Sequence, residues 1–375
     1  MKRRDKGLAT LVVLILLIVL GALSSQAEEG SEVRLLYEIV REIAATLGVG
    51  TPPPAGAPSP DWYTIAFTTP TCPPEEERHG GLDERIAADL AAAQTRVDVA
   101  AYDLDAPAIV DALIGLEKRG VAVHIVTDTD NEDLPSIRRL RRNGISVVTD
   151  DRTGLMHNKF IIIDDHILWT GSMNLTTNGV YCNNNNFVRF ENVAPLIENY
   201  RTEMEEMYTE RLFGPTSPVN TPHPTFTYAG VAMQNIFVPE ESAALAIARA
   251  VAGAQDEILI MAFSFTSEPI GEAVLGRAAS GVRVRGVFET TGSETEFSYY
   301  TKLKEAGYPS VQVRQDANPR IMHHKVIVID RRTVIFGSYN FSDNADRRND
   351  ENVLIVHDPT FAAPFVAEFE RLWNE

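Results

Sequence analysis

Most of the chain is written twice, and this repetition limits the fold more than any other feature of the sequence. The segment QTRVDVAAYDLDAPAIVDAL (residues 94–113) corresponds to QDEILIMAFSFTSEPIGEAV (residues 255–274), and each predicts an apolar strand, a polar turn and a helix. KRGVAVHIVTD (residues 118–128) corresponds to ASGVRVRGVFE (residues 279–289), in which a glycine turn precedes a strand. A repeat of this length predicts two similar halves related by an approximate twofold axis.

The order of elements within each copy predicts the fold class. Strands alternate with helices, which indicates an α/β fold with a mixed sheet flanked by helices in each half. The Pro-rich segment FGPTSPVNTPHPT (residues 213–225) has no periodicity and is predicted to be a linker between halves at residues 61–212 and 226–375. A twofold arrangement can bring equivalent edges together, so we expect the active site between the halves.

The first 60 residues belong to neither copy. MKRRDK is followed by an apolar run and by a small-residue site ending at Ala27, which predicts a signal peptide over residues 1–27 and therefore export. The alternative is an uncleaved membrane anchor through residues 8–23. Residues 28–60 are predicted to hold an amphipathic helix and then a Pro-rich linker, TPPPAGAPSP.

Export bears on the cysteines, of which the chain has 2. Outside the cytoplasm, a disulfide between Cys72 and Cys182 is chemically permitted. The sequence does not say whether their Cα atoms are close enough, so the pairing stays open here.

Charge limits the range of partners. The formal net charge is −18, and because residues 1–27 contribute +3, the rest of the chain carries −21. Such a charge repels polyanions at long range, which disfavours general nucleic-acid binding and also weakens binding to anionic bilayers. One basic cluster, in IRRLRRNG, is interpreted as a solvated helix face. It consists of Arg138, Arg139, Arg141 and Arg142.

A polar motif recurs in the two halves with identical gaps. A histidine and a lysine are separated by one residue, an aspartate follows after four more, and a Gly-Ser-x-Asn turn follows after another six. Alternate residues of a strand face the same side, so the histidine and lysine of each copy are expected to point the same way. The first copy contains His157, Lys159, Asp164, Ser172 and Asn174, and the second contains His323, Lys325, Asp330, Ser338 and Asn340.

The chemistry of these side chains indicates a phosphodiester substrate. One cleft lined by both copies would hold two imidazoles, two ammonium groups, two amides and two hydroxyls. Imidazole serves as nucleophile, acid or base near neutral pH. Lysine and asparagine donate hydrogen bonds to the non-bridging oxygens of a phosphate. One histidine could therefore attack phosphorus while the other protonates the leaving oxygen.

This doubled HxKxxxxD(x6)GSxN motif resembles that of the phospholipase D superfamily, and the resemblance covers residues 61–375. It implies a phosphodiesterase that forms a phosphohistidine intermediate and then transfers the phosphoryl group to water or an alcohol, without a metal or other cofactor. It implies that His157 and His323 are nucleophile and general acid, and we favour His157 as the nucleophile. By the same resemblance, Lys159, Lys325, Asn174 and Asn340 hold the phosphate, Ser172 and Ser338 support that site, and Asp164 and Asp330, though part of the catalytic motif, brace the turn.

The two copies differ at one position that matters for the histidines. In the superfamily, an acidic residue often follows each motif and orients a catalytic histidine. Glu351 stands 28 residues after His323, but the matching position after His157 is Asn185. Because an amide does not stabilise an imidazolium as a carboxylate does, the two histidines are expected to be inequivalent. Which of them Glu351 reaches stays open at this point.

These observations favour an exported enzyme that hydrolyses or transfers phospholipid headgroups, with a membrane surface as its partner. The alternative is an endonuclease of the same superfamily, since both halves are compact and the phosphodiester chemistry would be the same. A non-enzymatic phosphate-binding protein is a third hypothesis, which the intact residues of both motifs disfavour. Because one chain carries both motifs, a monomer is expected to build the whole site.

Overall fold

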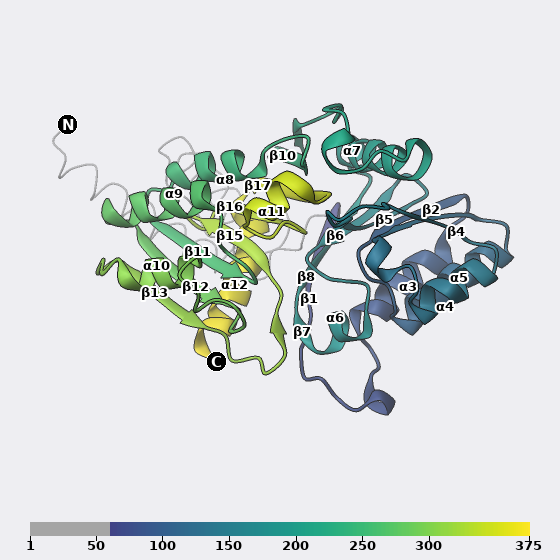
Figure 1. The fold of residues 1–375 in the computed structure, drawn as a ribbon, viewed down its shortest axis with the longest axis horizontal. Helices are drawn as coiled ribbons and strands as arrows, with labels where there is room; N and C mark the ends of the chain where they lie inside the picture. Colours follow the sequence, from purple (N-terminus) through teal and green to yellow (C-terminus); the bar gives the residue numbers. More distant parts are fainter. Residues whose placement is uncertain (1–60) are drawn as a thin grey trace, which may run out of the picture.

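The computed structural model of the chain describes residues 61–375 and shows two α/β halves side by side (Figure 1). The predicted signal peptide or anchor, and the predicted helix and linker up to residue 60, lie outside the described residues. Between residues 61 and 375, no helix combines the length and the apolar character needed to cross a bilayer. The predicted fold class of two similar halves, each a mixed sheet flanked by helices, is confirmed.

The first half is built on a seven-stranded sheet with the order β1-β8-β6-β5-β2-β3-β4. Strands β2, β3 and β4 run parallel, and the remaining neighbours are antiparallel. The strands are β1 (Tyr63–Phe67), β2 (Arg96–Ala101), β3 (Ala122–Thr127), β4 (Ser146–Thr149), β5 (Lys159–Ile163), β6 (Ile167–Gly171) and β8 (Asn186–Glu191). The helices are α3 (Leu82–Ala92), α4 (Pro107–Lys118), α5 (Pro135–Arg142), α6 (Thr177–Tyr181) and α7 (Ala194–Glu205), which a π-helical turn, η3 (Glu206–Glu210), continues.

The second half repeats this plan and adds one strand, in the order β13-β12-β11-β15-β16-β17-β10-β9. Its first strand begins at Thr225, the last residue of the predicted linker. The strands are β9 (Thr225–Tyr228), β10 (Val231–Val238), β11 (Glu257–Ala262), β12 (Arg283–Phe288), β13 (Val311–Gln315), β15 (Lys325–Ile329), β16 (Thr333–Gly337) and β17 (Glu351–His357). The helices are α8 (Ala243–Ala252), α9 (Glu268–Ala279), α10 (Tyr299–Glu305), α11 (Asp343–Arg348) and α12 (Pro359–Asn374).

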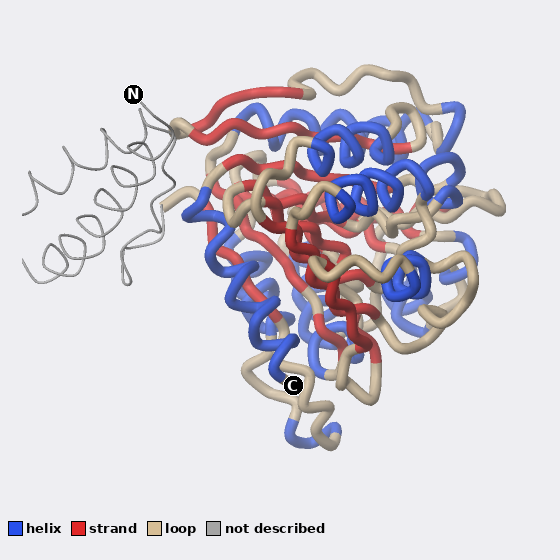
Figure 2. The backbone as a smooth tube through the Cα atoms, turned by 90° about the vertical axis from the view of Figure 1, so that its left-hand side faces the viewer, coloured by secondary structure: helices blue, strands red, loops and turns tan. Residues whose placement is uncertain are grey.

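Both faces of the central strands are buried, which explains their continuous apolar sequences. In β5, Phe160 and Ile162 pack into a hydrophobic cluster shared by the two halves, whereas Ile161 and Ile163 pack into a cluster of the first half alone. The corresponding strand β15 is divided in the same way between the shared cluster and one of the second half. Figure 2 shows most of the strands in the interior with helices around them, and a pair of strands along the upper edge. The shared cluster therefore joins the two halves into one folded body.

The halves also exchange backbone hydrogen bonds at a crossing. A short strand of the first half, β7 (Asn183–Asn184), pairs in parallel with β14 (Ile321–Met322) of the second half. At the equivalent place on the other side, Met156 forms a parallel bridge with Asp350. The segment just before each motif histidine is thus held by the other half.

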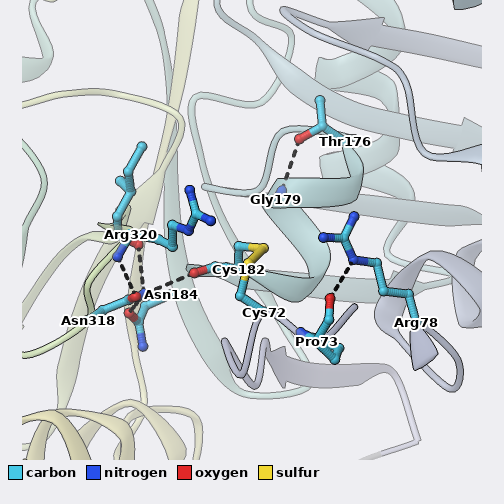
Figure 3. The surroundings of a disulfide bond; sticks show 10 residues. Cys72, Pro73, Arg78, Thr176, Gly179, Cys182, Asn184, Asn318 and Arg320 are labelled. Carbon is cyan, nitrogen blue, oxygen red and sulfur yellow. Dashed lines mark hydrogen bonds between the residues drawn. A yellow bond between two sulfur atoms is a disulfide. The ribbon is translucent and has the colours of Figure 1, made fainter. Parts of the chain in front are cut away.

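A disulfide lies beside this crossing. The structure pairs Cys72 with Cys182, whose Cα atoms are 4.2 Å apart, and so answers a question that the sequence leaves open (Figure 3). The bond fastens the loop after β1 to the end of α6. From the second half, the side chain of Asn318 donates hydrogen bonds to the carbonyl of Cys182 (3.1 Å) and to Oδ1 of Asn184 (2.6 Å). The disulfide therefore supports the first-half side of the crossing.

The arginine cluster of the sequence lies on α5, which precedes the first motif. All four arginines are exposed, and three of them form ion pairs with surface carboxylates, as expected for a solvated helix face. Exposed pairs of this kind contribute little to stability.

Candidate active site

The two His-Lys pairs lie where β5 and β15 begin. Lys159 and Lys325 are the first residues of these strands, and each histidine lies two residues earlier, before the strand starts. Each lysine Nζ donates to the carbonyl of its own histidine, at 2.8 Å in the first copy and 2.9 Å in the second. All four side chains are buried. The histidines leave the strand because their backbone amides pair with the other half: His157 donates to Asp350 (2.9 Å) and His323 to Asn184 (2.9 Å).

Each histidine ring is oriented by a side chain from the opposite half. Nδ1 of His157 lies 2.7 Å from Oε2 of Glu351. Nδ1 of His323 lies 3.0 Å from Oδ1 of Asn185. The question of which histidine Glu351 reaches is thereby answered: the carboxylate crosses to the first motif, and the matching amide crosses to the second.

The surrounding hydrogen bonds fix which nitrogen of each histidine carries the proton. The side-chain nitrogen of Asn185 donates to the carbonyl of Gly179 (2.8 Å), so its oxygen is turned toward His323 and accepts from Nδ1–H. Glu351 likewise accepts from Nδ1–H of His157. In the neutral form of either ring, Nε2 therefore keeps its lone pair, as a nucleophile or a proton acceptor requires.

The electrostatics of the site show that both motifs form one cluster. Burial lowers the pKa of His157 well below its usual value, and the charges of Lys159 and Lys325 lower it further. Burial also lowers the pKa of His323, where the same two lysines add to the effect. The pKa of Lys159 falls to about 7 through burial, although Glu351 opposes the change. Positive charge is therefore unfavourable at these groups, and a phosphate anion beside them would favour their protonation.

An aromatic ring borders each pair. Tyr102 lies edge-on to His157 with ring centroids 5.1 Å apart, and Phe263 lies in the same way beside His323 at 5.0 Å. The lysines lie over these rings, with Nζ 5.4 Å from the Tyr102 centroid for Lys159 and 4.7 Å from the Phe263 centroid for Lys325. Neither aromatic was predicted as a site residue. Their matching positions in the two sequence copies were the signal that could have identified them.

Comparison with known proteins agrees with this geometry. The sequence profile described as "Cardiolipin synthase, PLD-like domain" matches residues 86–208 and again residues 247–373, once in each half. The chain belongs to the phospholipase D-like family.

Three relatives illustrate how far the similarity extends. Human (Homo sapiens) mitochondrial cardiolipin hydrolase is 38% identical over 135 residues, which are 36% of this chain and 52% of the relative. A phospholipase D of Rickettsia conorii is 35% identical over 130 residues, which are 35% of this chain and 64% of the relative. The solved structure of phosphatidylserine synthase from Haemophilus influenzae Rd KW20 matches with a TM-score of 0.59 at 13% identity, covering 83% of this chain and 85% of that one, and shows the fold alone. The chain spans 50–60% of the length of these curated cardiolipin hydrolases.

A pair of carboxylates positions the histidine segments of this phospholipase D-like site. Oδ2 of Asp128, at the end of β3, accepts the backbone N–H of Met156 (2.9 Å). Oε2 of Glu289, at the end of β12, accepts the backbone N–H of Met322 (2.7 Å). Each therefore holds the residue immediately before a motif histidine. The sequence analysis did not identify them, although they too occupy matching positions in the repeat.

The motif aspartates contact backbone amides. The carboxylate of Asp164 accepts hydrogen bonds from the backbone N–H groups of Gln94, Thr95 and Arg96, which lead into β2, and from the Thr95 hydroxyl. Asp330 accepts the equivalent three backbone bonds ahead of β11. Partial burial would raise the pKa of Asp164, but these hydrogen bonds outweigh it and lower the pKa to about 2. Asp164 thus connects the turn between β5 and β6 to the start of β2, and Asp330 connects the turn between β15 and β16 to the start of β11.

The Gly-Ser-x-Asn turns pack tightly against β8, which begins just after Asn185, and β17, which begins at Glu351. Ser172 Oγ accepts the backbone N–H of Asn186 (3.1 Å), and Ser338 Oγ accepts that of Asn352 (3.0 Å). A Cβ on Gly171 would lie 2.4 Å from the carbonyl oxygen of Asn186, so no larger residue fits there without a shift. The serines therefore brace the site. In Asn174 and Asn340, Oδ1 is buried and has no hydrogen-bond partner within residues 61–375.

Proposed function

We propose that this chain hydrolyses the phosphodiester bond of phospholipid headgroups through a phosphohistidine intermediate, with His157 as the nucleophile and His323 as the general acid. The observation that carries this assignment is the inequality of the two histidine partners. His157 is hydrogen-bonded to a carboxylate and His323 to an amide. A nucleophilic imidazole becomes positively charged when it bonds to phosphorus, and a carboxylate stabilises that charge better than an amide does.

In the first step, Nε2 of His157 attacks phosphorus and a P–N bond forms. The bond from phosphorus to the leaving alcohol breaks, and His323 in its imidazolium form donates the Nε2 proton to that alcohol oxygen. Lys159 and Lys325 lie beside the histidines and would bind the non-bridging oxygens. The anionic phosphate favours the protonated His323 that this step needs, against the effect of burial.

In the second step, water replaces the alcohol. Neutral His323 takes a proton from the water as its oxygen attacks phosphorus, and the P–N bond to His157 breaks. The products are a phosphate monoester and the starting enzyme, with the proton back on His323. An alcohol in place of water would give headgroup exchange by the same route.

Three observations support a lipid as the substrate. Curated relatives are named mitochondrial cardiolipin hydrolase and phospholipase D, and they share more than a third of their aligned residues with this chain. The net charge of −18 disfavours a long polyanion. The apolar segment near the N-terminus predicts export or anchoring, so we also propose that the enzyme works at a membrane surface outside the cytoplasm.

The experiment is a parallel assay of the full chain, with EDTA present, on mixed phospholipid vesicles and on single-stranded DNA. We expect headgroup release that His157→Ala and His323→Ala both abolish. A p-nitrophenyl phosphodiester then separates the two roles, because its good leaving group needs no acid. On that substrate His323→Ala should regain a burst of nitrophenol, and His157→Ala should not. Cleaved DNA with intact lipid would refute the lipid proposal and favour the endonuclease hypothesis. A burst from His157→Ala would reverse the histidine roles.

A further inference from the structure

Three glutamates outside the catalytic site place their carboxylates together. One oxygen from each of Glu203, Glu206 and Glu240 lies within 4.8 Å of the other two. Glu203 is in the last turn of α7 and Glu206 begins η3, whereas Glu240 comes from the second half, in the turn after β10. Carboxylates at the C-terminal end of a helix also meet the negative end of its dipole. The arrangement therefore needs a source of positive charge.

Within residues 61–375, no basic side chain supplies that charge. None of the three glutamates forms an ion pair there, and Arg152 is paired with Asp150 and Asp350 instead. Glu203 and Glu206 are only 4% and 3% exposed. In the same range, Oε2 of Glu206 and Oε2 of Glu240 are buried and have no hydrogen-bond partner. Burial, with repulsion from neighbouring carboxylates, raises the pKa of Glu206 to about 7 and that of Glu240 to about 8.

The second half shows what occupies the equivalent place. Glu203 accepts a hydrogen bond from Asn158, the residue after His157, at 3.0 Å. Its counterpart Glu368, on α12, contacts His324, the residue after His323, at 3.2 Å. Three positions after Glu368 comes Arg371, whose guanidinium lies 2.7 Å from the Glu368 carboxylate. Three positions after Glu203 comes Glu206. Where the second half provides a cation for its buried glutamate, the first half provides another carboxylate.

We propose that Glu203, Glu206 and Glu240 bind one hard divalent cation, Ca²⁺ in the first instance, at a structural site separate from the catalytic histidines. The ligands are all carboxylate oxygens, the type that Ca²⁺ and Mg²⁺ select. Two oxygens at Ca²⁺ bonding distance from one ion are at most about 5 Å apart, so the observed separation fits with little movement. Ca²⁺ tolerates irregular geometry better than Mg²⁺.

The position of the site explains what the ion would do. Two of its ligands come from the first half and one from the second, so the ion would join the halves. One of its ligands, Glu203, accepts a hydrogen bond from Asn158, which is the residue next to His157 in the sequence. Asp350, which accepts the backbone N–H of His157, precedes Glu351. A bound ion would therefore stabilise the packing of the two halves near this crossing, without contacting substrate or being needed for hydrolysis.

The test measures cation binding directly. The full chain is stripped with EDTA, exchanged into chelator-free buffer and titrated with CaCl2 or MgCl2 by calorimetry, with thermal unfolding in parallel. We expect one Ca²⁺ per chain and a Tm several degrees higher when it is bound. Glu206→Gln should weaken the affinity at least tenfold. Glu198→Gln makes the same change at an exposed position of α7 and should leave the affinity unaltered.

A charge-reversing variant reproduces an arrangement of the second half, in which an arginine follows the buried glutamate three residues later. Glu206→Arg places a guanidinium three residues after Glu203, as Arg371 follows Glu368. We expect a metal-free Tm above that of the metal-free parent and no response to Ca²⁺. A parent protein that neither binds nor is stabilised by Ca²⁺, Mg²⁺ or Mn²⁺ would overturn the proposal, as would binding that survives both substitutions at Glu206. Loss of hydrolysis in EDTA while the chain stays folded, with recovery on adding Ca²⁺, would overturn the structural role.

Discussion

Replacing Glu351 by glutamine tests the assignment of the nucleophile most directly. Glu351 accepts a hydrogen bond from Nδ1 of His157 over 2.7 Å, and the two residues are 194 positions apart in sequence. Glutamine has nearly the same shape and can still accept that bond. Burial raises the pKa of Glu351 to about 7, and the positive charge that forms on His157 favours its ionised form, so the substitution removes a charge when that charge develops and leaves the geometry in place. It also makes the partner of His157 an amide, as Asn185 already is for His323.

The size of the effect follows from the charge that develops on the ring. A carboxylate about 4 Å from a unit positive charge stabilises it by about 4 kcal/mol at an effective dielectric constant near 20. The amide keeps a neutral hydrogen bond worth about 1–1.5 kcal/mol. The difference of about 2.5–3 kcal/mol corresponds to a fall in kcat of about 70- to 160-fold.

The assay is single-turnover hydrolysis of the p-nitrophenyl phosphodiester and steady-state headgroup release from vesicles. Both should slow by that factor in Glu351→Gln, with little change in KM or in Tm. Asp343→Asn is a matched control, because Asp343 is an exposed carboxylate on α11 whose one ion-pair partner among residues 61–375 is Arg347.

Two results would refute the reasoning. If Glu351→Gln kept kcat within threefold of the parent, the carboxylate would not be stabilising charge on His157. If the variant slowed the second step and left the nitrophenol burst unchanged, Glu351 would be serving a general acid, and the histidine roles would be exchanged.

Three further predictions concern the orienting amide, the motif aspartate and the disulfide. Asn185→Asp should raise the pKa of His323, because a carboxylate opposes the lowering of that pKa by burial and by the lysine charges. The basic limb of the kcat–pH profile should therefore move up by about one pH unit. A basic limb that does not move would contradict the general-acid role of His323. Asp164 has its pKa lowered to about 2, so its contribution to stability is present above the unfolded-state pKa of about 4 and is lost as the pH falls through 2. Asp164→Asn should therefore lower the free energy of unfolding, measured by urea titration, by about 1–2 kcal/mol at pH 7 and by less at pH 3. Equal losses at both pH values would argue against an effect of the Asp164 charge. Replacing Cys72 and Cys182 by alanine opens a link across 110 residues and should lower the stability by about 2–4 kcal/mol while retaining hydrolysis at 25 °C; an unchanged Tm would show that the bond does not constrain the chain.

The fold and the motif residues could be predicted because their signals are local and repeated. Apolar strands, glycine turns and helices recur in the same order in both copies, and these periodicities depend on neighbours a few residues apart. The identical gaps within the two motifs placed His157, Lys159 and their counterparts at equivalent points. The α/β class with two halves and the family followed from those patterns, and both are confirmed.

The sequence alone determined two like halves, each with one motif histidine and one motif lysine, and an acidic residue in one half where the other has an amide. Tertiary structure alone decided how these parts meet. Because strand β7 pairs with β14 and Met156 bridges to Asp350, each half places its orienting side chain beside the histidine of the other. The cluster of three glutamates arises in the same way, whereas the disulfide depends on how the first half itself folds. Contacts between segments so far apart depend on how the two halves pack, and neither local periodicity nor motif spacing specifies that packing.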